Sequence, residues 1–141
     1  AASDVYKRQA QEMARKTLEN GGSTLMCKTA EDIENITAKS AAEAAENGDE
    51  TAKEVYRICG EKLGEGLAIL ADILDPQAII IGSIFARSGH LLKDNMEKAL
   101  HREALSQTAG CRIIPAGLGE KIGDLASLGI ALDAAANGGK A

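Results

Sequence analysis

The longest regular pattern in the chain lies between residues 50 and 74, where apolar side chains recur every three or four positions. This spacing places them on one face of a helix, so it predicts a single helix of roughly 37 Å at 1.5 Å per residue. Asp49 precedes it as an N-cap, and Pro76 cannot continue it. The positions predicted to be buried are Val55, Ile58, Cys59, Leu63, Leu67, Leu70 and Leu74.

The same helix carries a row of small residues, Gly60, Gly64 and Ala68, at a spacing of four. Each glycine costs about 0.5–1 kcal/mol relative to alanine inside a helix, so two on one face indicate the close approach of another backbone. The sequence leaves open whether that backbone belongs to the same domain or to a second copy of the chain.

A short apolar run follows at 78–81 and stops at Gly82. Its three consecutive isoleucines are β-branched and too few for a buried helix, so we predict a buried parallel strand with helices above and below. Ser88 is the expected N-cap of the next helix, over 89–105, and residues 111–115 read as a second strand with Pro115 at its end or on an edge. The predicted buried side of this helix comprises Leu92, Met96, Ala99 and Leu100.

Helices flank this unit on both sides. We expect one over 11–19 that ends at Asn20-Gly21-Gly22, a short one after Thr29, and one from Thr37 or Lys39 to Glu46. Leu25 and Met26 are the expected anchors between the first two, and Ile33 and Ile36 the apolar side of the second. A last helix is expected over 120–136, with Ile122, Leu125, Ala126, Gly129, Ile130 and Leu132 as its packing residues.

The order of elements predicts an α/β fold that is rich in helix, with a short parallel or mixed sheet and a right-handed β–α–β crossover. Two short strands make a thin sheet, so further strands would be needed for a free-standing domain. Residues 1–9, AASDVYKRQ, do not join the pattern. We expect them to be a non-native or disordered leader, and the domain to occupy 10–139.

The amino-acid composition and net charge argue against several classes of function for this chain. The chain has 141 residues, a net charge of −5 and no tryptophan. That charge argues against a nucleic-acid partner for this segment, and no apolar run is long enough for a membrane span. Cys27, Cys59 and Cys111 lack the spacing of a disulfide framework or a zinc site, which fits a cytoplasmic protein. His90 and His101 fall on the exposed side of their helix, so we predict no metal ligands.

Ligands of open α/β sheets bind at the carboxyl ends of the strands. Gly82 therefore marks the expected binding edge, with Ser83 beside it.

The segments LDPQAIIIGSIF and IIPAGLGEKIGDLASLGIAL resemble the ROK family, which groups sugar kinases with sugar-responsive transcriptional repressors. The similarity runs from about residue 10 to the C-terminus and covers only the C-terminal portion of a family member. It implies part of an actin/hexokinase-like (ribonuclease H-like) ATPase fold, with ATP, Mg²⁺ and a sugar bound by the parent protein. Gly82 then lies against the nucleotide, while Ser83 and Ile84 replace two family glycines.

The resemblance further implies that the parent is a glucokinase-like sugar kinase, which transfers phosphate to a hexose or N-acetylhexosamine. The family motifs DxGGT, ExGH and CxCGxxGCxE are absent from this chain. We therefore expect no catalytic residue here and no activity from the chain alone. A sugar-responsive repressor, or a non-catalytic sugar-binding or dimerisation module, remains the alternative. Family members are commonly dimeric, so a homo-oligomer is expected.

Overall fold

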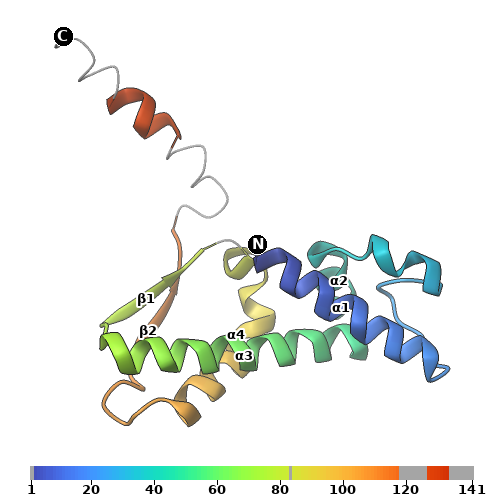
Figure 1. Cartoon of the computed structure of the whole chain (residues 1–141), viewed down its shortest axis with the longest axis horizontal. Helices are drawn as coiled ribbons and strands as arrows, with labels where there is room; N and C mark the ends of the chain where they lie inside the picture. Colours follow the sequence, from blue (N-terminus) through green and yellow to red (C-terminus); the bar gives the residue numbers. More distant parts are fainter. Residues whose placement is uncertain (1, 83, 118–126, 134–141) are drawn as a thin grey trace.

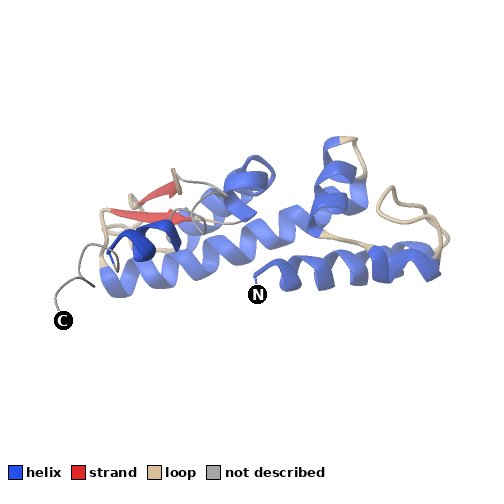
Figure 2. Cartoon of the chain, turned by 90° about the horizontal axis from the view of Figure 1, so that it is seen from above, coloured by secondary structure: helices blue, strands red, loops and turns tan. Residues whose placement is uncertain are grey.

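The computed structural model describes residues 2–82, 84–117 and 127–133. A long helix, α3, lies along much of the body, with α1 and α2 near one end and a small sheet beside the other (Figure 1). Seen from above, the sheet stacks against the helices rather than extending them (Figure 2). The elements are α1 (Ala2–Glu19), the 3₁₀ helix η1 (Ala30–Asn35), α2 (Ala38–Glu46), α3 (Glu50–Leu74), β1 (Ala78–Ile81), α4 (Ile84–Glu103) and β2 (Arg112–Pro115).

Asp49 is the N-cap of α3, as predicted, and it also accepts hydrogen bonds from the loop before η1. Its carboxylate accepts hydrogen bonds from the backbone N–H of Ala52 at 2.7 Å, the N–H of Leu25 at 2.6 Å and the hydroxyl of Thr24 at 3.1 Å. The helix ends at Leu74, and Asp75 takes the left-handed conformation with φ 44°. The predicted bounds of this helix are therefore confirmed.

The small-residue row of α3 packs inside the domain. A Cβ on Gly60 would lie 2.7 Å from the carbonyl oxygen of Leu92, and one on Gly64 would lie 2.7 Å from the Cβ of Ala99. Both neighbours belong to α4, so the close approach is intramolecular. Of the two readings that the sequence left open, the structure supports packing within the domain.

Only some of the residues that were predicted to be buried on α3 are buried. Val55 and Leu67 are buried, whereas Leu70 is 46% and Leu74 66% exposed. Contacts of α4 with the small-residue row lie at Gly60 and Gly64. Leu70 and Leu74 lie nearer the C-terminal end of α3, where no described element covers them fully.

The two strands pair in parallel, from Ala78 opposite Arg112 to Ile81 opposite Pro115. This confirms the predicted parallel strands, with Pro115 at the end. The prediction that both faces are covered is wrong for the described residues. Side chains alternate along a strand, so Ile79, Ile81 and Ile113 pack against the helical core while Ile80 and Ile114 point outwards.

The helix after β1 begins at Ile84, five residues earlier than predicted, and ends at Glu103. Ser88 interrupts it with non-helical φ −120° and ψ 19°. Its side chain hydrogen-bonds to Tyr56 of α3, whose hydroxyl donates to the carbonyl of Ala38 at 3.1 Å. Ser88 thus marks a kink rather than a helix start. The predicted buried side is confirmed: Leu92, Met96, Ala99 and Leu100 are at most 1% exposed.

Residues 2–9 are helical, so their exclusion from the fold is corrected. They form the first turns of α1, and Tyr6 packs near Tyr56 with ring centroids 6.3 Å apart. The apolar contact of Tyr6 explains why the helix extends so far. That the segment is non-native stays a prediction.

Between α1 and α2 the predictions hold in part. Met26 is 7% exposed, but Leu25 is 66% exposed because its N–H, not its side chain, is anchored on Asp49. The short helix after Thr29 is a 3₁₀ helix, with Ile33 and Ile36 buried.

The predicted last helix is described only at 127–133, where the chain is helical. Ile122, Leu125 and Ala126 lie outside the described residues. Ile130 and Leu132 do not pack as predicted, being 72% and 62% exposed, and Gly129 is exposed as well. Figure 1 shows this turn of helix away from the body, which explains the exposure. Among the described helices, none has the length and apolar character to cross a membrane.

Candidate functional site

The carboxyl ends of β1 and β2 meet at one edge of the sheet because the strands are parallel and in register. Gly82 follows β1, and the N–H of Ala116 donates to the carbonyl of Ile81 at 2.8 Å. Among the described residues, a Cβ on Gly82 would come within 4 Å of the Cβ of Ala116 alone, at 3.8 Å. The backbone at Gly82 is therefore open to approach from outside. Ser83, the other predicted contact, lies outside the described residues.

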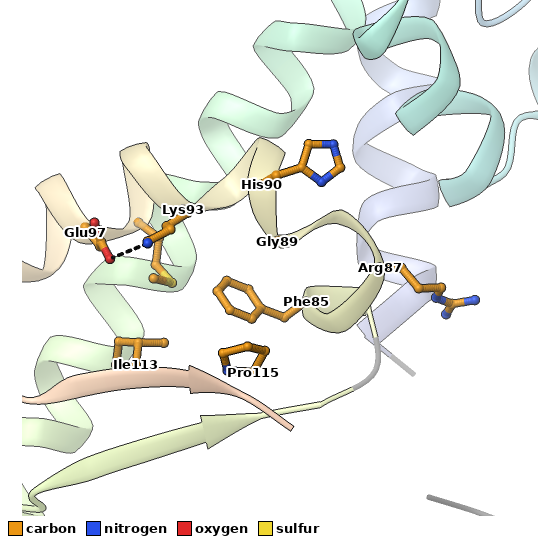
Figure 3. A pocket seen from close by; sticks show the side chains of 9 residues that line it. Phe85, Arg87, Gly89, His90, Lys93, Glu97, Ile113 and Pro115 are labelled. Atoms are coloured by element: carbon orange, nitrogen blue, oxygen red, sulfur yellow. Dashed lines mark ion pairs between the residues drawn. The ribbon is translucent and has the colours of Figure 1, made fainter. Parts of the chain in front are cut away.

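A cavity of about 390 Å³ opens between α4 and β2, next to this edge (Figure 3). Its floor is apolar, with Phe85 and Pro115 facing each other and Ile113 beside them, and Met96 also lines it. A flat apolar ligand group can pack against such a floor.

The rim of this cavity, by contrast, is mainly basic. Arg87, His90 and Lys93 lie along α4, and Glu97 adds one carboxylate. Lys93 pairs with Glu97 at 3.8 Å, and His90 pairs with Glu46 of α2 at 2.9 Å. Arg87 points away from Phe85 in Figure 3. The rim therefore carries basic side chains, and an anionic group that approached Lys93 or His90 would compete with their carboxylate partners Glu97 and Glu46.

A second cavity, of about 380 Å³, lies on the other side of Phe85 and reaches Gly82. Ile58, Cys59 and Leu63 of α3 line it, together with Tyr6 of α1. Burial raises the pKa of the Cys59 thiol to about 11 and that of the Tyr6 hydroxyl to about 12. Both groups are neutral at physiological pH, so this cavity offers apolar contact and no activated nucleophile.

Phe85 lines both cavities and is itself 7% exposed. It separates the basic cavity beside β2 from the apolar cavity beneath Gly82. Neither Phe85 nor the basic row of Arg87, His90 and Lys93 was among the residues predicted for the site. Two signals were available, since Phe85 follows the strand by four residues and the basic residues recur at every third position of a helix.

No metal centre is evident in the described part of the chain, where no three His, Cys, Asp or Glu side chains come together. His90 and His101 are exposed, as predicted, and Nδ1 of His101 donates to the carbonyl of Glu97 at 2.7 Å. Cys27, Cys59 and Cys111 are free thiols. What the described residues bring together is an apolar floor with a rim of basic side chains, next to the His90–Glu46 pair.

Residues 10–133 match the profile of the ROK family. The fold is similar to a ROK family glucokinase from Streptomyces griseus, crystallised with glucose and AMPPNP, at 30% identity and a TM-score of 0.70. That likeness covers 82% of this chain and 38% of the glucokinase. A putative sugar kinase from Cytophaga hutchinsonii has the same fold at a TM-score of 0.66 and 21% identity, covering 85% of this chain and 40% of that one.

Among curated proteins, the chain is 30% identical over 73 residues to the transcriptional dual regulator NagC of Escherichia coli. It is 31% identical over 70 residues to the repressor Mlc of the same organism. These matches cover 52% and 50% of this chain, but only 18% and 17% of the relatives. The fold, the parallel strand pair and the profile match over most of the chain agree, and the chain belongs to the ROK family.

Proposed function

We propose that this chain is the nucleotide-contacting part of an ATP-dependent sugar kinase that phosphorylates a hexose or N-acetylhexosamine. The observation that carries the proposal is the 30% identity, over 82% of the chain, to a glucokinase crystallised with both glucose and a nucleotide analogue. The chain spans only 38% of that kinase, so the proposal concerns a longer parent protein.

Within this proposal, Gly82 and Ser83 contact the nucleotide. Gly82 supports it because its backbone is open and stands at the carboxyl edge of the parallel strands, where α/β proteins bind ligands. The apolar and basic cavities beside it suit a base and a phosphate, respectively. The described residues contain no carboxylate cluster for Mg²⁺, so the metal would be held mainly by the nucleotide and by other parts of the parent.

We also expect that the chain alone is inactive. Phosphoryl transfer needs a positioned sugar hydroxyl, a proton acceptor and charge stabilisation around the γ-phosphate. The edge at Gly82 supplies contacts for one side of a nucleotide and no opposite wall for a sugar. A coupled ADP-release assay of the 141-residue chain with glucose, mannose, fructose and N-acetylglucosamine should therefore read background.

The decisive experiment uses the full-length parent. Gly82→Val should raise KM for ATP about tenfold, equivalent to the loss of about 1.4 kcal/mol of contact, with little change in KM for sugar. Gly110→Val is the matched control, because Gly110 also has open space around a Cβ but precedes β2 at the opposite edge. Sugar-dependent turnover by the short chain, or equal effects of the two variants, would contradict the proposal.

A sugar-responsive repressor is the second candidate, because the 30% identity to NagC is as high as that to the glucokinase, though over a shorter stretch. A parent that binds N-acetylglucosamine and operator DNA but releases no ADP would favour it. A measured kinase activity without DNA binding would favour the first candidate.

We also propose that the protein forms a homo-oligomer, following the family resemblance. The Gly60–Gly64 row no longer supports this, since α4 occupies it. Light scattering decides the point: a mass that stays near 14.7 kDa over a wide concentration range would show that this part of the protein is a monomer.

A further inference from the structure

Tyr56 lies where three helices meet. It belongs to α3, is 2% exposed, and its hydroxyl donates to the backbone carbonyl of Ala38, the first residue of α2, at 3.1 Å. Its oxygen also shares a hydrogen bond with the side chain of Ser88 in α4, which is 7% exposed. A phenol has one proton to donate, and Ala38 receives it, so the Ser88 hydroxyl is the donor in the second bond. One buried phenol group thus joins α2, α3 and α4.

Ser88 is the residue at which α4 changes direction, since its φ of −120° and ψ of 19° are not helical. The side chains of the basic cavity beside β2 stand on both sides of this kink (Figure 3). Phe85 and Arg87 precede it, whereas His90 and Lys93 follow it. The angle at Ser88 therefore fixes where one half of the lining lies relative to the other.

The two parts of α4 are held in different ways. After the kink, the helix meets α3 backbone to backbone, because a Cβ on Gly60 would lie 2.7 Å from the carbonyl oxygen of Leu92. Before the kink, the side chain of Phe85 is buried and its N–H donates to the carbonyl of Gly82 at 3.3 Å. A movement of the turn before the kink would thus be passed directly to the backbone at Gly82.

We propose that Tyr56 is a positioning residue for the nucleotide edge at Gly82. It acts through Ser88, which ends the turn that carries Phe85, and the inference rests on the proposed function. Without the Tyr56 hydroxyl, the Ala38 carbonyl and the Ser88 hydroxyl would lose a partner in a place largely closed to water. Because unpaired buried polar groups are costly, both would move to find new partners, and the turn before the kink would move with them.

A second link between α2 and α4 lies at the surface. Nε2 of His90 is 2.9 Å from Oε1 of Glu46, but the two side chains are 57% and 51% exposed. Water can replace either partner in such a pair, so an exposed ion pair contributes little to holding two elements together. The hydrogen bonds of Tyr56 are shielded from water, and for this reason the positioning role falls to them.

The first measurement is hydrogen exchange, followed by mass spectrometry, on the 141-residue chain. Tyr56→Phe keeps the buried ring and removes only the hydroxyl. Amides in 84–91 should exchange about fivefold faster, the factor that corresponds to the net strength of one hydrogen bond, whereas amides in 95–103 should be unchanged. Thr51→Val is the matched control on the same helix, because it removes a hydroxyl that contacts Thr17 of α1 at 3.0 Å. It should leave exchange at 84–91 unchanged.

Ser88→Ala tests whether Ser88 is the partner through which Tyr56 acts. It removes the donor and should raise exchange in 84–91 by a similar factor. In the Ser88→Ala background, Tyr56→Phe should then add little, because the interaction between the two side chains has already been lost. Additive effects of the two changes would show that Tyr56 acts by another route, and would overturn the proposal.

The second measurement is steady-state kinetics of the full-length parent. Tyr56→Phe should raise KM for ATP about fivefold and leave kcat and KM for sugar unchanged, whereas Thr51→Val should alter none of them. A parent that turns over no ATP would refute the proposed function, and hydrogen exchange would then decide the positioning role by itself.

Three further outcomes would overturn the proposal. Exchange that accelerates uniformly along the chain would show that the Tyr56 hydroxyl serves only the stability of the fold. Unchanged exchange in 84–91 would show that the hydroxyl does not hold the turn before the kink. An unchanged KM for ATP in an active parent would show that this turn does not position the nucleotide edge.

Discussion

The carbonyl oxygen of Leu92 lies 2.7 Å from the point where a Cβ on Gly60 would stand. The two helices α3 and α4 therefore meet backbone to backbone, without a side chain between them. Four residues further along, Gly64 repeats the arrangement against Ala99. This contact holds α4, and with it the candidate site, against the longest helix of the protein.

A Cβ at this contact should destabilise the fold. We expect Gly64→Ala to lower the free energy of unfolding by about 1–3 kcal/mol, because overpacking forces the two backbones apart. Gly66→Ala is the control on the same helix, since a Cβ there meets nothing within 4 Å. It should stabilise by about 0.5–1 kcal/mol through helix propensity. Urea unfolding measures both, and equal signs would show that α3 and α4 are not in close contact.

Asp49→Ala should be the more costly of two cap mutations. It removes the acceptor of three hydrogen bonds, to Ala52, Leu25 and Thr24, and leaves largely buried donors unpaired. We expect a loss of at least about 2 kcal/mol. Thr37→Ala removes only the exposed cap of α2, which accepts from Ser40, and should cost about 1 kcal/mol. Hydrogen exchange at the Leu25 amide should accelerate only in the Asp49 variant.

The buried tyrosines should make the stability of the fold depend on pH in the alkaline range. Burial raises the pKa of Tyr6 to about 12 from an ordinary value of 10, and it also raises the pKa of Tyr56. A raised folded-state pKa means that the unfolded chain loses its proton first. The contribution of Tyr6 to stability is thus fully present below pH 10 and is lost as the pH rises from 10 to 12.

Absorbance at 295 nm can follow this titration, because the chain has only two tyrosines. In Tyr56→Phe, the remaining midpoint should stand near pH 12 and fall to about 10 in denaturant. A folded-state midpoint near 10 would show that residues 2–9 do not pack on α3, and would favour the prediction that they are a leader foreign to the domain.

The chain should carry no stoichiometric zinc. A structural zinc site needs four convergent ligands, and the described residues contain no group of three. Elemental analysis of protein purified without an affinity tag should find far less than one zinc per chain. One zinc per chain, lost together with stability on treatment with a chelator, would refute this.

The sequence by itself determined what depends on neighbours along the chain. Helix periodicity, the cap at Asp49 and the break at Pro76 set the two ends of α3, and the β-branched run with its glycine set β1, which ends before Gly82. These features are local, because caps, breakers and side-chain spacing act over a few residues. The sequence also indicated the close approach of another backbone at Gly60 and Gly64, because glycine destabilises a helix interior unless its missing side chain allows such a contact.

Tertiary structure decided which surfaces those elements present. Only the placement of α4 shows that the small-residue row packs within the domain and that Leu70 and Leu74 stay exposed. Ser88, at the kink of α4, hydrogen-bonds to Tyr56, thirty-two positions away in sequence, and Phe85 lines two cavities. Such contacts join distant residues, so no periodicity along the chain can encode them, and the lining of the site became visible only once the chain had folded.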